Sequence, residues 1–375
     1  MREYLTVFLV AAAITYLVGV VAREVALRTG AVAKVRDRDV HAVPIPYFGG
    51  VAMLCGLWAA YLVAWHLPFL SLSDDRVFRD GAVVLAGGTL ICAVGVLDDL
   101  IELDPLTKLG GQVLAAAILP LFQVQFYAFA LPGGGQVSAD PTQAALASVL
   151  LVVATVNAVN FVDGLDGLAA GVVGFGAVGF FAFCYVLADA NGETLAITAA
   201  FLCAALAGAC GGFLPHNFFP ARLFMGDSGS MLLGYVLAAS ALTLTGQFAM
   251  VDMTRGAGES EASLLPTLMP VILPLAILIV PFADLVLAVV RRTRAGRSPF
   301  AADKQHLHHR LLEIGHSQRR AVLIMWLWAA LIAFGGVLAS LYAGGVTTVV
   351  LLVWFLVTVA LTFLVPRVQR PGSGL

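Results

Sequence analysis

Acidic and amide side chains gather in short polar stretches that interrupt long apolar segments. In residues 157–168, Asn157, Asn160 and Asp163 recur every third residue and Asp166 follows. Two Asp-Gly pairs in this stretch break the helical pattern, and their glycines let a ligand approach the backbone closely. A mere turn would not need four polar side chains, so we expect their oxygens to face one ligand cavity.

Two further stretches carry carboxylates. Asp98 and Asp99 close an apolar segment shortly before Lys108, whereas Asp227 lies in Phe-Met-Gly-Asp-Ser-Gly-Ser at residues 224–230. Adjacent carboxylates point about 100° apart on a helix, so one can meet a metal ion while the other orients a neighbour or takes a proton. The small residues around Asp227 suit a magnesium-phosphate site. The plainer interpretations are a membrane exit for the acidic pair and an N-cap for Asp227.

Imidazoles and cations fill two other polar stretches. Residues 303–310 read Asp-Lys-Gln-His-Leu-His-His-Arg, and the candidate binding groups are His306, His308, His309 and Arg310. Three histidines suggest zinc, but no fourth ligand has a zinc spacing and a neighbouring arginine disfavours a cation, so we expect contact with phosphate. The stretch 37–50 holds His41, cations and two glycines. Its plainer interpretation is a charged connector.

The composition places these polar stretches in a membrane protein. Of the 375 residues, 60% are hydrophobic and 12% are charged, and the mean hydropathy is +0.94. These values exclude an ordinary water-soluble domain. The long segments are apolar all round rather than alternating, which predicts spanning helices and not a barrel. We expect one all-α membrane domain over residues 1–375 and no nucleic-acid partner.

Windows of about 20 apolar residues, the length of a spanning helix, recur along the chain. We predict eleven spans, at residues 4–26, 47–67, 80–98, 109–127, 142–160, 166–187, 194–213, 229–247, 268–290, 321–343 and 346–365. With the N-terminus outside and the C-terminus in the cytoplasm, 17 of the 21 Lys and Arg residues fall on the inner side. That bias follows the positive-inside rule and places all five polar stretches on the cytoplasmic face.

Oxygen ligands, imidazoles and arginines at a membrane surface describe an enzyme that joins a polar diphosphate to a lipid phosphate. In their order along the chain, Asp98-Asp99, residues 157–168, residues 224–230 and His306-Leu307-His308-His309 resemble the motifs of the polyprenyl-phosphate N-acetylhexosamine-1-phosphate transferases. The resemblance extends from Arg38 to about Arg320. The interrupted histidine run, and the His-x-x-x-x-Pro-x-x-Gly-Gly element that begins at His41, are similar to the WecA/TagO-type branch.

The resemblance implies transfer of GlcNAc-1-phosphate from UDP-GlcNAc to undecaprenyl or decaprenyl phosphate, with release of UMP, in the bacterial inner membrane. It implies Mg²⁺, or Mn²⁺ in its place, held by Asp227 and Asn160. Asp98 would orient or deprotonate the lipid phosphate with support from Asp99. The histidines at 306, 308 and 309 would join these carboxylates as catalytic groups. The implied substrate-binding residues are His41, Lys108, Asn157, Asp163, Asp166, Asn217, Phe224 and Arg310.

Other functions stay open at this point. The peptidoglycan branch of the same family transfers phospho-MurNAc-pentapeptide and carries consecutive histidines in its last motif. A transporter would place charges near the bilayer midplane, whereas most acids here lie at the inner ends of the spans. A prenyltransferase would need paired Asp-x-x-Asp motifs, and only Asp163 and Asp166 have that spacing. The oligomeric state also stays open, a homodimer included.

Overall fold

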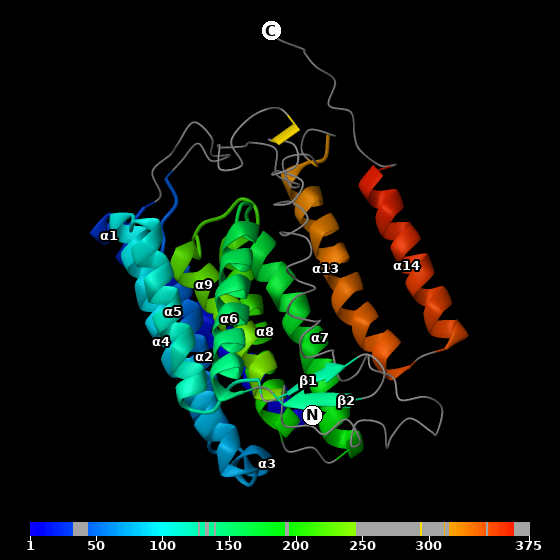
Figure 1. The fold of residues 1–375 in the computed structure, drawn as a ribbon. Coiled ribbons are helices and arrows are strands. Elements are labelled where there is room, and N and C mark those ends of the chain that lie inside the picture. Colours follow the sequence, from blue (N-terminus) through cyan, green and yellow to red (C-terminus); the bar gives the residue numbers. More distant parts are fainter. Residues whose placement is uncertain are drawn as a thin grey trace.

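A computed structural model describes residues 1–32, 44–126, 128–131, 135–138, 140–191, 195–244, 293–294, 311, 315–342 and 344–363. Within these ranges the chain forms a bundle of long helices (Figure 1). The helices are α1 (Arg2–Thr29), α2 (Gly49–Ala64), α3 (Pro68–Ser71), α4 (Asp75–Ile101), α5 (Pro105–Leu121), α6 (Pro141–Val162), α7 (Leu168–Asn191), α8 (Leu195–Asn217), α9 (Gly226–Leu244), α13 (Gln318–Leu341) and α14 (Gly345–Phe363). Two short strands, β1 (Ala128–Leu131) and β2 (Gly135–Ser138), pair antiparallel.

Short sequence signals begin several of these helices. Asp104 and Asp140 each precede a proline, and their side chains accept hydrogen bonds from backbone amides of the first turn of α5 and α6. Asp74 caps α4 in the same way through the amide of Arg76, at 2.9 Å. An aspartate N-cap followed by a proline is favourable because the cap satisfies free amides and proline needs none.

The prediction of an all-α membrane protein is confirmed. Eight helices of the described chain are long and apolar enough to cross a membrane. The shorter apolar helices α2 and α5 coincide with the predicted spans 47–67 and 109–127. The predicted span 268–290 lies outside the described residues, so the count of eleven and the orientation stay predictions.

One boundary was wrong. Helix α5 ends at Leu121 instead of continuing to residue 127. The chain turns there because Gln123 adopts a left-handed backbone conformation, with φ 68°, and the amide of Val124 bonds back to the carbonyl of Leu119 at 2.9 Å. Apolar composition alone does not show such a stop, since Val124 and Phe126 remain buried after the helix has ended.

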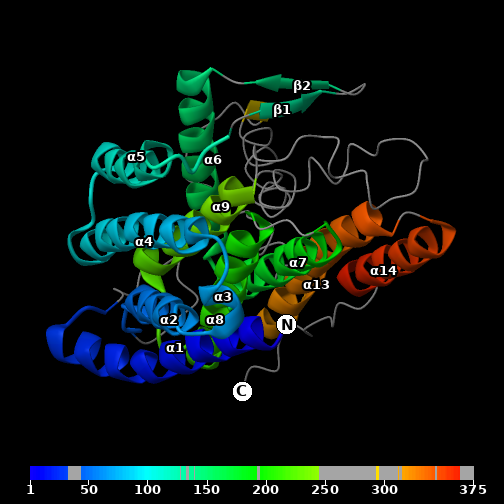
Figure 2. The same cartoon turned by 90° about the horizontal axis from the view of Figure 1, so that it is seen from below.

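Helix α9 forms the centre of the bundle. Every residue of α9 from Ser228 to Leu244 is buried. It packs against α2, α4, α6 and α8, and the view from below shows these helices around it (Figure 2). By contrast, most of α14 is exposed although it is strongly apolar, as expected for a helix that faces lipid. Because α9 is buried among its neighbours, its N-terminal turn has a defined position in the bundle.

Glycines bring two neighbours into contact with the first turn of α9. A Cβ atom on Gly95 of α4 would lie 2.4 Å from the Cα of Ser228, and one on Gly50 of α2 would lie 2.3 Å from the amide nitrogen of Gly229. Both distances are shorter than any real contact, so only glycine permits this packing. The polar stretch 224–230 is therefore held between α2 and α4.

Candidate functional site

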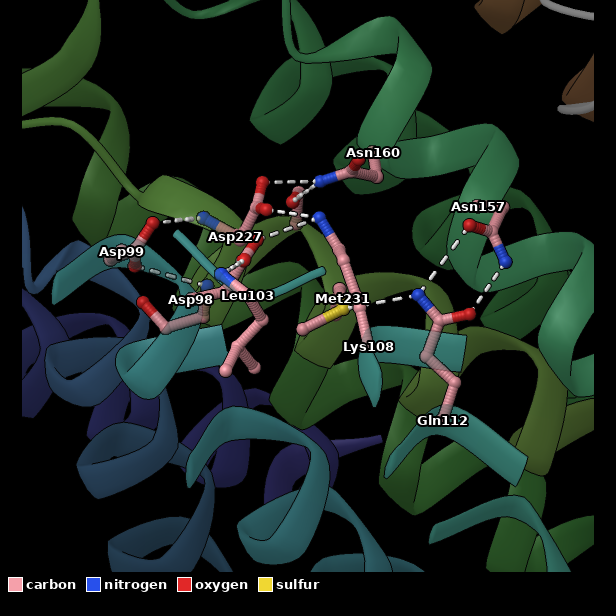
Figure 3. Close-up of polar contacts among 11 residues, drawn as sticks. Asp98, Asp99, Leu103, Lys108, Gln112, Asn157, Asn160, Asp227 and Met231 are labelled. Carbon is pink, nitrogen blue, oxygen red and sulfur yellow. Dashed lines mark hydrogen bonds and ion pairs between the residues drawn. The ribbon is translucent and has the colours of Figure 1, made fainter. Parts of the chain in front are cut away.

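Four helix ends meet at one end of the bundle and bring together polar groups that are far apart in the sequence (Figure 3). Asp98 comes from the end of α4, Lys108 from the start of α5, Asn160 from the end of α6 and Asp227 from the first turn of α9. We call these four residues the carboxylate layer. Residues from three of the five predicted polar stretches therefore lie together.

Asp227 lies at the centre of the carboxylate layer. Its Oδ1 accepts a hydrogen bond from Nδ2 of Asn160 at 2.6 Å, and its Oδ2 accepts one from Nζ of Lys108. Nδ2 of Asn160 also donates to Oγ of Ser230 at 2.8 Å. About a quarter of the Asp227 side chain, 28%, stays exposed, so a ligand can reach it.

The N-cap interpretation of Asp227 was wrong, because Asp227 lies inside the first turn and Asp99 caps the helix from outside. Asp99 Oδ1 accepts from the amide of Asp227 at 2.8 Å and Oδ2 accepts from the amide of Ser228 at 3.3 Å. A carboxylate at a helix N-terminus is stabilised by the free amides and by the helix dipole. Gly226, with φ 67°, makes room: a Cβ there would lie 2.3 Å from Asp99 Oδ2.

The neighbouring carboxylate, Asp98, has different partners. Its Oδ2 lies 2.9 Å from Nζ of Lys108, and its Oδ1 accepts a hydrogen bond from the amide of Leu103 at 2.8 Å. The ammonium group of Lys108 therefore bridges Asp98 and Asp227. The three side chains are mostly shielded from solvent, so this charge interaction is stronger than that of a surface ion pair.

Asp163 lies at the C-terminal end of α6, in the loop that leads to α7. Burial, followed by the negative charges of Asp227, Asp99 and Asp166, raises the pKa of its carboxyl to about 8. At neutral pH this group is therefore mainly protonated. The shift shows that Asp163 shares the electrostatic field of the carboxylate layer.

Asp166 and Asn217 tie two loops together. Oδ2 of Asp166 accepts from the amide of Ala221 at 2.9 Å, and Oδ1 of Asn217 accepts from the amide of Gly167 at 2.9 Å. Nδ2 of Asn217 donates to the carbonyl of Leu223 at 3.1 Å. Both side chains are buried, which indicates that they shape the loops around the site. Their predicted contact with a substrate stays a prediction.

Phe224 is half-buried, and its ring lies 6.4 Å from that of Tyr47. Its backbone pairs with the segment before α2: the amide of Phe224 donates to the carbonyl of Pro46 at 2.9 Å, and its carbonyl accepts from Gly49 at 3.0 Å. Tyr47 was missed by the sequence analysis, because nothing in its spacing connects it with residue 224. Two aromatic rings therefore border the loop next to the carboxylate layer.

Below this layer the structure adds a residue that the sequence analysis missed. Asn157 pairs with Gln112 of α5, since its Nδ2 donates to Oε1 of Gln112 at 2.7 Å. Its predicted contact with a substrate stays a prediction. The available signal was the position of Gln112, a buried polar residue four residues after Lys108 in an apolar segment. His41, His306, His308, His309 and Arg310 lie outside the described residues, and their roles stay predictions.

The carboxylate layer and the adjacent Ser230 have oxygen ligands of the kind that Mg²⁺ binds. Asp227 offers a carboxylate, Ser230 a hydroxyl and Asn160 a carboxamide, and all three oxygens are of the hard type that Mg²⁺ prefers. Within the described ranges no three His, Cys, Asp or Glu side chains are close enough to hold an ion by themselves.

Several known proteins are similar to this chain. A family model described as glycosyl transferase family 4 matches residues 82–245. The decaprenyl-phosphate N-acetylglucosaminephosphotransferase of Mycolicibacterium smegmatis is 44% identical over 100% of this chain and 91% of its own length. A probable undecaprenyl-phosphate N-acetylglucosaminyl 1-phosphate transferase of Bacillus subtilis is 28% identical over 87% of the chain and 82% of its own length. The phospho-N-acetylmuramoyl-pentapeptide-transferase of Mycolicibacterium smegmatis is 31% identical over 81% of the chain and 86% of its own length.

Proposed function

Because the chain belongs to the polyprenyl-phosphate N-acetylhexosamine-1-phosphate transferases, in the WecA/TagO-type branch, we propose that it transfers GlcNAc-1-phosphate from UDP-GlcNAc to a polyprenyl phosphate. The observation that carries this proposal is the carboxylate layer, in which Asp98, Lys108, Asn160 and Asp227 meet at one end of a membrane bundle. We propose decaprenyl phosphate as the acceptor, since the relative with 44% identity is named for decaprenyl phosphate and the one named for undecaprenyl phosphate is 28% identical.

In the proposed reaction an oxygen of the lipid phosphate attacks the β-phosphorus of UDP-GlcNAc. A new P–O bond forms there, the bond from the β-phosphorus to the bridging oxygen breaks, and UMP leaves with that oxygen. Such a transfer needs positioning and charge stabilisation more than covalent help from the protein. We favour direct attack over a covalent aspartyl intermediate.

The residues of the carboxylate layer divide this work. Asp98 holds and deprotonates the lipid phosphate, and Lys108, which already contacts Asp98, neutralises the phosphate charges. Asp227 holds Mg²⁺, or Mn²⁺ in its place, and Asn160 orients Asp227 through its amide group. If the side-chain amide of Asn160 rotated by half a turn, its oxygen would point to the place beside Asp227 where its NH2 group now lies. When bound, the metal ion supplies positive charge for the diphosphate.

We place the site on the cytoplasmic face of a bacterial inner membrane. At the end of the bundle that holds the carboxylate layer, the described basic residues include Arg23, Arg28, Lys108, Arg222, Arg319 and Arg320. The opposite end carries Arg2, Arg76 and Arg79. The excess of positive charge at the site end supports the cytoplasmic assignment through the positive-inside rule.

A panel of sugar donors tests the proposed function. Purified enzyme is incubated with Mg²⁺, decaprenyl or undecaprenyl phosphate, and UDP-GlcNAc, UDP-GalNAc or UDP-MurNAc-pentapeptide, and UMP release is measured. We expect the fastest release with UDP-GlcNAc and decaprenyl phosphate, and radiolabelled sugar in the organic phase. A preference for UDP-MurNAc-pentapeptide would contradict the branch. Label that accumulates inside vesicles instead of in lipid would indicate a transporter.

The raised pKa of Asp163 predicts how magnesium affinity depends on pH. A cation near Asp227 favours the ionised form of Asp163, so binding must release the proton that Asp163 holds below about pH 8. We expect the affinity for Mg²⁺ to rise with pH, by up to about tenfold per unit, and to level off above about pH 8. Calorimetry in buffers of different ionisation enthalpy measures the released proton.

Asp163→Asn is the matched variant for this measurement, because it keeps the shape of the side chain and cannot ionise. It should bind Mg²⁺ with a weaker pH dependence and release fewer protons. The stability of the wild type should depend on pH through the same group. Because the folded pKa of Asp163 is near 8, above that of an unfolded aspartate, the wild type loses stability as pH rises from about 4 to about 8. The Asp163→Asn variant should lack this pH dependence. Equal pH profiles for the two proteins would refute the role of Asp163.

A further inference from the structure

One helical turn below the carboxylate layer, a second polar layer joins three of the same four helices. It consists of Gln112 on α5, Asn157 on α6 and Met231 on α9 (Figure 3). Each of these residues is three or four positions from the member of the carboxylate layer on its own helix. Residues at that spacing share a helix face, so each group of the second layer lies under a group of the first.

The second layer is closed by a reciprocal pair of amides. Nδ2 of Asn157 donates to Oε1 of Gln112 at 2.7 Å, and Nε2 of Gln112 lies 3.4 Å from Oδ1 of Asn157. The same Nε2 lies 3.3 Å from the sulfur of Met231, which brings α9 into the layer. Asn157 also donates to the carbonyl of Val153 at 2.8 Å, within its own helix. Gln112 is 1% exposed and is the residue that contacts both other helices.

The buried amide of Gln112 and the half-buried amide of Asn157 give this layer a fixed geometry. An amide that loses its partner among apolar helices is unfavourable, so α5 and α6 stay at the separation that keeps both hydrogen bonds. One turn higher, Lys108 on α5 and Asn160 on α6 must both reach Asp227. A shift of α5 by about 1 Å along or across α6 would break one of these contacts, and displacements of that size impair catalysis.

We propose that Gln112 is a positioning residue for the transfer reaction: through its amide pair with Asn157 it sets the spacing of Lys108 and Asn160 around Asp227. This inference rests on the proposed function. Gln112 lies below the carboxylate layer and has no part in binding the donor, so its effect falls on the rate of the chemical step and leaves the KM for UDP-GlcNAc unchanged.

Gln112→Met tests the proposal, because methionine keeps the length of the side chain and removes both polar groups. We expect kcat to fall by about tenfold to a hundredfold, with the KM for UDP-GlcNAc within about twofold of the wild type. Gln112→Glu keeps the acceptor for Asn157 and loses the donor, so a smaller loss is expected. It also serves as the second variant if Gln112→Met does not fold.

Rescue separates positioning from general stability. The double variant Gln112→Asn with Asn157→Gln moves one methylene group from α5 to α6 and keeps the amide pair. We expect it to recover most of the kcat that Gln112→Met loses. Tyr235→Phe is the matched control, since the hydroxyl of Tyr235 donates to the carbonyl of Ala115 at 3.1 Å and joins α9 to α5 farther from the site. It should lower the melting temperature and leave kcat unchanged.

The possible results distinguish a positioning role of Gln112 from a general effect on stability and from a failure of the proposed function. An unchanged kcat in Gln112→Met, no rescue by the exchanged amides, or an equal loss of kcat in Tyr235→Phe would overturn the positioning role. Wild-type enzyme that releases no UMP from UDP-GlcNAc would contradict the proposed function, and the inference would fall with it. The wild-type assay therefore distinguishes the two failures.

Discussion

Replacing Asp227 with asparagine is expected to lower kcat by about three orders of magnitude while the protein stays folded. Asparagine keeps the shape of the side chain, but it removes the negative charge that faces Lys108 and that we propose holds Mg²⁺. Loss of that charge also removes repulsion from Asp98 and Asp99, so the melting temperature should not fall. UMP release and thermal unfolding of the purified variant measure the two quantities.

Asp140→Asn provides the control for Asp227→Asn. Asp140 caps α6 by accepting from the amide of Thr142 at 3.1 Å, at the end of the bundle away from the site. Asparagine caps helices about as well as aspartate, so neither kcat nor stability should change. If Asp227→Asn retained a tenth or more of the wild-type turnover, Asp227 would not be the central ligand of the reaction.

Lys108→Met is expected to lower kcat by roughly a hundredfold to a thousandfold. Methionine keeps the apolar stem and removes the ammonium group, so that Asp98 and Asp227 lose the cation that joins them. In the proposed reaction the same group neutralises phosphate. Measurements of kcat and of KM for both substrates should show the larger change in kcat.

The matched control for Lys108→Met is Arg28→Met. Arg28 forms an ion pair with Glu24 at 3.0 Å, but its side chain is 77% exposed. Surface pairs of this kind contribute little to stability, so the control should leave kcat unchanged.

Asp98→Asn tests the ion pair between Asp98 and Lys108 from the side of the carboxylate. If Asp98 takes a proton in the reaction, the acidic limb of the pH–rate profile disappears in this variant. An unchanged limb, or a Lys108→Met enzyme within tenfold of the wild type, would refute these roles.

Much of the architecture could be predicted because it depends on local properties of the chain. Continuous apolar segments of spanning length identify the helices, and aspartate before proline marks the start of α5 and α6. The residues that meet at the candidate site could also be singled out, because carboxylates, amides and a lysine at membrane helix ends have few structural uses. The order of the motifs then identified the family, which the relatives confirm.

The different contacts of Asp98 and Asp99 could not be predicted from the sequence. Two adjacent carboxylates look alike along the chain, and their roles depend on partners from other helices. Asp99 caps α9 because Gly226, 127 positions later, lets the first turn approach, whereas Asp98 reaches Lys108. Helical geometry fixes only the angle between the two side chains. Packing of the helices decides which one meets which group.

Helix packing also decides the hydrogen-bond partners of Asn157, Asn217 and Gln112. The sequence by itself determined that the chain is an α-helical membrane protein with oxygen-rich groups at the ends of its helices, since hydropathy, caps and residue types are local. Only the tertiary structure decided that Asn217 joins two loops and that Asn157 pairs with Gln112. A buried amide takes whichever partner packing brings within hydrogen-bond distance, and those partners lie 50 and 45 residues away in the chain.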